Sequence, residues 1–405
     1  MSTTSLLYQA FGVRGYQLVR TDFQLGEVVF TIGQNRERYC CAACGSREVV
    51  AHGTKPRLWE TVPIGKRRVR IFFEVPRVEC RRCLAVRQVP LGFADPKRSY
   101  TRSFERYALE LCRRMTIKDV AHHLGIGWDT VKDIQKRHLT AEYATIPVRK
   151  LRQIAIDEIA IASGHRYFTV VLDLESGAVV HIGDGKGIAA LVPFFRKLKA
   201  AHAKIKAVAT DLAPTYVAAI KKHLPHAAHV FDRFHVVKLF NEKLADLRRE
   251  LHRELDNDKE KKLLKGVRWL LLKNPEHLDD EKQERQRLEA ALALNAPLAT
   301  AYYLKEDLRQ FWEQPTKLAA LLHLEHWIRK ARASGVAILK KFADTLSFYR
   351  PGLLAWYDYP ISTGPLEGTN NKIRTLQRQA YGFRDLEFFK LKIYHLHKTR
   401  YAFVG

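Results

Sequence analysis

The feature that most constrains this chain is a pair of Cys-x2-Cys motifs near its N-terminus. Cys41 and Cys44 form the first motif, and Cys80 and Cys83 form the second. Four thiolates with this spacing are typical of a structural zinc site, because each tight turn directs two sulfurs toward one tetrahedral ion. The 35 residues between the motifs exceed the common spacing of roughly 15–20. The sequence therefore predicts a β-hairpin inserted between the two motifs.

The identity of the first zinc ligand stays open at this point. Cys40 directly precedes Cys41, and it would serve equally well with three residues between it and Cys44. Zinc held by four thiolates has no open position for a substrate, so its predicted role is structural. The alternative is a set of buried free thiols.

Charge indicates the kind of partner. The 405-residue chain has 69 Lys and Arg against 43 Asp and Glu, a net charge of +26. Such a charge favours a polyanionic partner, because each phosphate that the protein neutralises releases counterions. No N-terminal apolar run resembles a signal peptide, and no run of about 18 apolar residues could span a bilayer. We expect a cytoplasmic protein without a membrane partner, nucleoid-associated when bound to DNA.

A helix-turn-helix is predicted in “TIKDVAHHLGIGWDTVKDIQKRHL”. Thr116 suits the N-cap of its first helix, and Gly125 suits the left-handed position that ends it. The second helix, from about Asp129 to Leu139, would lie in the major groove while its flanks contact phosphates. The alternative is an ordinary helical hairpin in a core. The residues expected to contact DNA are Trp128, Thr130, Lys132 and Lys136.

Beyond Pro147 the pattern is that of an α/β fold. Three consecutive strands are predicted in “QIAIDEIAIA”, “RYFTVVLDLES” and “AVVHIGDG”. Helices then alternate with two further strands, “IKAVATD” and “AAHVFD”. Three strands followed by alternation predict a mixed sheet flanked by helices. From about His235 to Phe348 the pattern is helical and heavily charged.

Three carboxylates are candidates for a metal site. Asp157 lies mid-strand, and the period of two sends the neighbouring Glu158 to the opposite face. Asp211 ends a strand, the usual place for a functional group in a sheet with crossover helices. Glu367 opens a later helix in a basic stretch. Hard oxygen donors suit Mg²⁺ or Mn²⁺, and two such ions can promote phosphoryl transfer. For each acid alone, the alternative is a hydrogen-bonded surface group.

The order of these segments resembles the insertion-sequence transposases of the ISL-three family. The most specific matching segments are “VATDLAPTY”, “HVFDRFHVVKL” and “GPLEGTNNKIRTLQRQAYGFR”, and the resemblance covers nearly the whole chain. It implies a DDE transposase with an RNase H-like core, in which Asp157, Asp211 and Glu367 are the catalytic acids and bind two Mg²⁺ (or Mn²⁺) ions. It also implies a helical insertion between Asp211 and Glu367.

Further residues are candidates for supporting roles. “FDRFH” places Asp232 and His235 in a D-x2-H pattern similar to one found after the fifth strand in several DDE groups. The alternative is a helix-capping Asp and a packing His. Asn370, Asn371 and Arg374 follow Glu367 on one side of the predicted helix and would orient its carboxylate or contact DNA. The DNA contacts expected there are Lys372, Arg374 and Arg378.

The predicted architecture is an α/β, RNase H-like mixed-sheet core with a helical insertion, preceded by a β-rich zinc domain and a helix-turn-helix domain. The predicted boundaries are 1–95 for the zinc domain, 96–147 for the helix-turn-helix, 148–240 for the first part of the core, 241–348 for the insertion and 349–405 for the C-terminal part of the core.

The predicted function is a transposase that binds the terminal inverted repeats of its element in double-stranded DNA. It would cleave the ends and join them to target DNA in Mg²⁺-dependent steps, as a dimer or larger assembly. Two alternatives stay open. One is a zinc and helix-turn-helix regulator without catalysis, and the other is a metal-dependent nuclease without strand transfer.

Overall fold

The computed structural model describes residues 6–24, 26–162 and 164–398. The chain divides into two compact units, Met1–Thr145 with Gln377–Gly405, and Ile146–Leu376. Within the described part of the chain, no helix combines the length and apolar character that crossing a bilayer requires.

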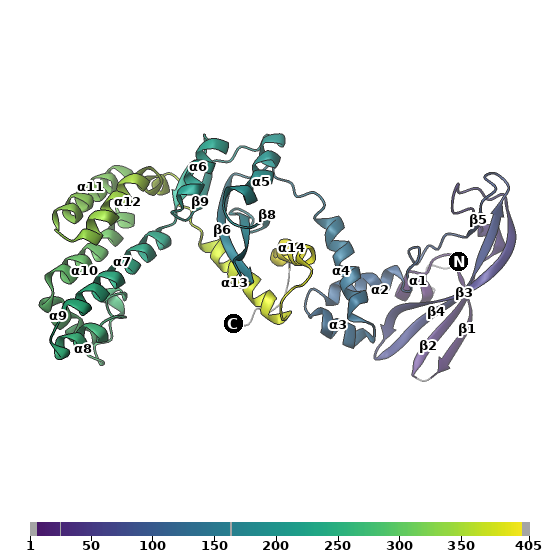
Figure 1. The fold of residues 1–405 in the computed structure, drawn as a ribbon. Coiled ribbons are helices and arrows are strands. Elements are labelled where there is room, and N and C mark those ends of the chain that lie inside the picture. The colour runs from purple at the N-terminus through teal and green to yellow at the C-terminus, as the bar shows by residue number, and fades with distance from the viewer. Residues whose placement is uncertain (1–5, 25, 163, 399–405) are drawn as a thin grey trace. The chain divides into compact units, whose positions relative to one another are not determined.

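The first unit begins with a β-sheet of order β1-β2-β4-β3, with β5 paired to β4. The β3–β4 hairpin lies between the two cysteine motifs, so the predicted insertion is confirmed (Figure 1). Its inward side chains, including Trp59, Val69 and Ile71, are fully buried. The sheet strands are β1 (Gln17–Gln24), β2 (Glu27–Gly33), β3 (Val49–Ile64), β4 (Arg67–Cys80) and β5 (Val86–Gln88), preceded by the short helix α1 (Leu6–Phe11).

The helix-turn-helix follows in the same unit. The Thr116 hydroxyl accepts a hydrogen bond from the Asp119 N–H at 3.2 Å, and Gly125 takes the left-handed conformation with φ 64°. Both predicted signals are therefore confirmed. Val120 and Leu124 of the first helix pack with Val131 and Ile134 of the second. The helices are α2 (Arg102–Leu111), α3 (Ile117–Leu124) and α4 (Trp128–Glu142).

The C-terminal segment belongs to this unit as well. Helix α14 (Leu386–Tyr394) and the 3-10 turn Leu396–Lys398 contact α4. The Tyr143 and Tyr394 rings stack with centroids 5.7 Å apart. Helix α14 is thus part of the core around the second helix of the helix-turn-helix motif.

The second unit is built on a mixed sheet of order β10-β9-β6-β7-β8. Strands β6, β7 and β8 pair antiparallel, whereas β9 and β10 run parallel to β6. Apolar side chains of two helices, α5 and α6, pack on one face. The α/β class and the RNase H-like mixed sheet are thereby confirmed. The elements are β6 (Gln153–Ala162), β7 (Arg166–Asp173), β8 (Val179–Asp184), α5 (Ile188–Ala200), β9 (Ala207–Thr210), α6 (Pro214–His223) and β10 (Ala228–Phe231).

A helical insertion separates β10 from the helix that carries Glu367, as expected (Figure 1). Its core includes Phe240, Trp327 and Phe342, whose rings meet edge to face. The helices are α7 (Arg233–Glu254), α8 (Asp258–Gly266), α9 (Glu284–Leu294), α10 (Ala296–Arg309), α11 (Lys317–Ala333) and α12 (Ala337–Leu354), and α13 (Gly364–Gln379) follows them.

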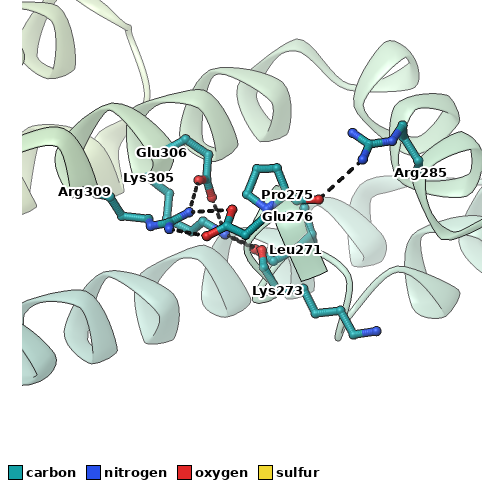
Figure 2. A network of polar contacts seen from close by, with 8 residues as sticks. All are labelled: Leu271, Lys273, Pro275, Glu276, Arg285, Lys305, Glu306 and Arg309. Atoms are coloured by element: carbon teal, nitrogen blue, oxygen red, sulfur yellow. Dashed lines mark hydrogen bonds and ion pairs between the residues drawn. The ribbon is translucent and has the colours of Figure 1, made fainter. Parts of the chain in front are cut away.

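A buried lysine fixes the connection between α8 and α9 (Figure 2). The Lys305 ammonium donates hydrogen bonds to the backbone oxygens of Leu271 and Lys273, both at 2.9 Å, and lies 2.7 Å from the Glu306 carboxylate. Arg309 contacts Glu306 as well. Backbone oxygens beyond a helix end need such partners when water is excluded. The insertion is therefore held by specific polar bonds as well as by its apolar core.

Candidate active site and DNA-binding elements

Strand register brings the first two candidate acids together. Ala155 of β6 lies opposite Ala209 of β9 in a parallel pair. If that register is extended by two residues, Asp211, which directly follows β9, lies next to Asp157 on the same face, and the charge of Asp211 does act on Asp157. Opposite Thr210 is Phe231, so Asp232, which directly follows β10, lies at the level of Asp211. Asp157 in β6 and the two acids that follow β9 and β10 thus form a row of carboxylates.

Glu158 occupies the other face, as the period of two predicts. Its Oε1 accepts hydrogen bonds from the Tyr216 hydroxyl at 2.9 Å and from the Gly187 N–H at 3.0 Å. These partners belong to α6 and to the N-cap of α5. The face that bears Asp157 is therefore the one opposite α5 and α6.

Helix α13 contacts that face beside β6 (Figure 1). The Asn370 Nδ2 donates a hydrogen bond to Asp157 Oδ2 at 2.8 Å. Glu367 lies in the first turn of α13, as predicted. It stands one turn before Asn370, and helical residues three apart lie on the same side with Cβ atoms about 5–6 Å apart. Glu367 therefore lies one helical turn before the residue that contacts Asp157.

The Glu367 carboxylate itself is exposed. It makes no hydrogen bond or ion pair with residues 6–24, 26–162 and 164–398. Among those residues, the four cysteines are the only group of three or more His, Cys, Asp or Glu side chains whose ligand atoms lie close enough together to hold one metal ion. The three acids do not form such a group. In the structure Asp157 is therefore close enough to Asp211 for their charges to interact, and Glu367 is exposed in the first turn of α13.

Electrostatics favour a cation between the two strand acids. Burial raises the pKa of Asp157, while the Glu158 N–H and the charge of His235 oppose the rise. Burial likewise raises the pKa of Asp211, opposed by the Ala213 N–H and by His235. Buried neighbouring carboxylates need positive charge to remain ionised. Carboxylate oxygens in this setting suit Mg²⁺ or Mn²⁺.

Asp232 differs from Asp211 because its oxygens already have partners. Its Oδ1 accepts from the Phe234 N–H at 3.0 Å at the N-cap of α7, and its Oδ2 accepts from the Thr363 hydroxyl. His235 Nδ1 lies 3.5 Å from the same Oδ2. Burial alone would raise the pKa of Asp232, but bonds from His235, Thr363 and Phe234 outweigh burial and lower it. The helix-capping alternative for Asp232 is thus observed.

His235 lies close enough to Asp157, Asp211 and Asp232 for their charges to affect its pKa. Its pKa is raised, first by the bond to Asp232 and also by the charges of Asp157 and Asp211. A protonated His235 therefore offsets part of the negative charge of the row.

The four cysteines of the two motifs form one cluster. The sulfurs of Cys41, Cys44, Cys80 and Cys83 all lie within 4.8 Å of one another. Cys40 lies outside this cluster, so the geometry favours Cys41. Gly45 and Leu84, which follow the second cysteine of each pair, both have left-handed backbones with φ 72° and 57°. Two similar knuckle turns thus present four sulfurs to one point, the geometry of a metal-binding site.

The candidate DNA contacts differ in accessibility. Trp128 is 61% exposed at the start of α4, and Thr130 is half-buried. Lys132 and Lys136 both contact Asp385 Oδ2, at 3.0 and 2.9 Å. Sequence reasoning missed Asp385, the N-cap of α14, because the contact joins residues that are remote in the chain.

The basic residues of α13 face water. Lys372, Arg374 and Arg378 are exposed. The Arg374 guanidinium donates to Asn371 Oδ1 at 2.8 Å. These cations are accessible to solvent, whereas the two lysines of α4 are paired with Asp385.

Family profiles match three successive parts of the chain. A profile described as “Transposase” matches residues 154–393. The “helix-turn-helix domain of transposase family ISL3” matches residues 89–139, and the “zinc-finger of transposase IS204/IS1001/IS1096/IS1165” matches residues 37–83. The chain belongs to transposase family ISL3.

Individual relatives agree with this assignment. The chain is 35% identical over 356 residues to the transposase for insertion sequence element IS1001 of Bordetella parapertussis, covering 87% of each chain. It is 31% identical over 371 residues to the transposase for IS1557 of Mycobacterium tuberculosis, covering 85% of this chain and 82% of the relative. The resemblance drawn from the sequence motifs and the prediction of a transposase are confirmed.

A solved structure, the Drosophila P element transposase strand transfer complex, aligns with a TM-score of 0.42 and 12% identity. The alignment covers 73% of this chain and 91% of that one.

Proposed function

We propose that this ISL3 transposase uses Asp157, Asp211 and Glu367 as a DDE triad. The triad would bind two Mg²⁺ (or Mn²⁺) ions, cleave DNA at the element ends and join the freed 3′-hydroxyl to target DNA. The observation that carries this proposal is the parallel register that sets Asp157 beside Asp211. The hydrogen bond from Asn370 to Asp157 supports it, because that bond brings the Glu367 helix to the same face.

The surrounding residues would prepare the site. The Asp157 carboxylate is held by Asn370 and by the Glu158 N–H, and Asp211 is held by the Ala213 N–H. His235 would balance negative charge beside a scissile phosphate. When bound, the divalent ions would activate the attacking oxygen and stabilise the leaving oxygen.

The N-terminal unit would select the DNA. Zinc bound by Cys41, Cys44, Cys80 and Cys83 would fix the two knuckle turns. The helix-turn-helix would then bind the terminal inverted repeats, while Lys372, Arg374 and Arg378 would contact backbone phosphates near the chemistry. Both ends must be held for joining, which requires a dimer or larger assembly on cytoplasmic, nucleoid DNA.

The test combines labelled element-end DNA, a target plasmid and Mg²⁺ with four variants. Asp157→Asn, Asp211→Asn and Glu367→Gln should each abolish cleavage and joining while end binding persists. Glu175→Gln is the matched control, because this exposed acid follows β7 of the same sheet. Full joining by any of the three acid variants would refute the triad. Cut ends without joined product from the unaltered protein would favour the nuclease alternative.

A further inference from the structure

We propose that Asn370 is a positioning residue of the acid site. Its amide nitrogen fixes the orientation of Asp157, and its amide oxygen adds a neutral oxygen donor for a divalent cation beside that carboxylate. This inference rests on the proposed role of Asp157 and deepens it.

The position of Asn370 in α13 is the first observation. The buried side chains of α13 are Leu366, Asn370, Ile373 and Leu376. Asn370 is 2% exposed, and it is the one polar member of this otherwise apolar stripe. A buried amide is unfavourable unless hydrogen bonds compensate its lost hydration. A helix that only needed to pack on the sheet would carry an apolar residue there.

The second observation is how completely Asp157 is held. Asn370 Nδ2 donates to Asp157 Oδ2 at 2.8 Å, and the Glu158 N–H donates to Asp157 Oδ1 at 2.7 Å. One bond on each oxygen fixes the plane of the carboxylate. An ionised carboxylate only accepts hydrogen bonds, so the amide must turn its NH2 group toward Asp157. The amide oxygen is then directed elsewhere.

That amide oxygen is the third observation. Asn370 Oδ1 is buried and has no hydrogen-bond partner among the described residues. Nearly all buried polar atoms have partners, so an unpaired one on the side chain that holds Asp157 points to a partner supplied by a ligand. Amide oxygens are hard donors of the kind that Mg²⁺ and Mn²⁺ accept.

Charge explains why an amide suits this position better than an acid. Asp157, Asp211 and Asp232 already bring three carboxylates to this part of the sheet. A carboxylate at position 370 would repel Asp157 where the amide attracts it. The amide thus supplies an oxygen without adding negative charge.

The chain provides a control in the same helix. Gln379 is exposed in the last turn of α13, so it has the same amide group as Asn370 and lies on the same helix, but it has no role in the proposed site. Asn370→Leu keeps a similar volume and suits the apolar stripe, yet it removes both the donor and the acceptor. Asn370→Ala removes them with less bulk.

Mn²⁺ binding gives a readout that does not depend on turnover. Zinc-loaded full-length protein with end DNA is titrated with Mn²⁺ and followed by electron paramagnetic resonance, and cleavage is measured against Mg²⁺ concentration. Loss of a residue that orients a metal ligand typically weakens metal binding or activity by 10–100-fold. We expect Asn370→Leu to raise the Mn²⁺ and Mg²⁺ concentrations at half-effect by about tenfold or more. Gln379→Ala should stay within about twofold, because this exposed amide does not contact the site.

Each outcome bears on the proposal. Wild-type metal dependence in Asn370→Leu would overturn it, and so would loss of the fold in both Asn370 variants, because packing alone would then explain the residue. Thermal melting and end binding without added Mg²⁺ report the fold. Asp157→Asn distinguishes a failure of the proposed triad from a failure of the proposed role of Asn370. If it keeps full cleavage, the proposed triad fails; if it is inactive while Asn370→Leu is normal, only the role of Asn370 fails.

Discussion

The buried hydroxyl of Thr363 donates a hydrogen bond to Asp232, 131 positions earlier in the chain. The chain leaves the sheet at Asp232 and returns from the helical insertion at Thr363, so this bond ties the two ends of the insertion together. The first turn of α13, which contains Glu367, is therefore anchored to the end of β10. The position of the third acid depends on this anchor as well as on the insertion.

Thr363→Val should weaken that anchor. The variant keeps the shape of the side chain but leaves buried Asp232 without one donor, which costs about 1–3 kcal/mol in the free energy of unfolding. We expect a lower urea midpoint and slower cleavage at the element ends. Thr369→Val is the control, because that hydroxyl only bonds back to Pro365 O within α13. Equal effects of the two variants on cleavage would contradict the anchoring role.

Asp385→Asn should tighten binding to end DNA. Asp385 holds Lys132 and Lys136 and so competes with phosphates for both cations. Partly exposed ion pairs contribute about 0.2–1 kcal/mol each, so the loss of both should lower Kd by about two- to thirtyfold. Asn is also a good N-cap, so α14 should keep its start.

Fluorescence anisotropy at several salt concentrations measures that effect. Glu387→Gln is the control, since Glu387 is 86% exposed and lies 3.7 Å from Lys136. Unchanged or weaker affinity in Asp385→Asn would show that these lysines do not contact DNA.

Local patterns in the sequence predicted most of the fold. Thr116 and Gly125 mark the start and the end of one helix through hydrogen bonds to residues a few positions away. The alternation of side chains around Asp157 predicted both the strand and its two faces. The signals at these positions are local, so they can be read from neighbouring residues. The order of strands and the resemblance to known transposases supplied the rest of the architecture.

Contacts between remote residues could not be predicted in this way. Nothing near Asp385 indicates that its partners are Lys132 and Lys136, and nothing near Thr363 indicates Asp232. The only signal for Asn370 is a polar residue at an apolar helical position, which a sequence shows but does not explain. Its contact with Asp157 becomes visible once α13 is placed on the sheet.

Removal of the cysteine cluster should unfold the region around the β3–β4 hairpin. Cys44→Ser should reduce bound zinc from one ion per chain to almost none, because a tetrahedral site needs all four thiolates for high affinity. Cys40→Ser and Cys112→Ser are matched controls, since neither belongs to the cluster. Metal analysis and circular dichroism provide the measurement. Zinc loss in Cys40→Ser with retention in Cys41→Ser would reverse the ligand assignment.

Lys392 makes the stability of the first unit depend on pH. Burial lowers the pKa of Lys392 from 10.5 to about 8, and its ammonium lies 3.4 Å from Gln135 Oε1. Between these two pKa values the unfolded chain binds a proton that the folded chain has lost, so stability rises with pH from about 8 to 10.5. Below pH 8 the free energy of unfolding is therefore lower by about 3 kcal/mol than above pH 10.5, because each unit of pKa difference contributes about 1.36 kcal/mol.

Lys392→Met should remove this dependence. The variant has a similar shape and no charge to bury, so at pH 7 it should be more stable than the unaltered protein by up to about 3 kcal/mol. The advantage should shrink as pH rises toward 10.5, because Lys392 is then neutral in both states. Urea unfolding of both proteins at several pH values measures the difference, and subtracting one curve from the other removes the contribution of the tyrosines and cysteines that do not interact with Lys392; Cys112 does interact with it. A difference that does not change with pH would mean that Lys392 keeps its ordinary pKa in the folded chain.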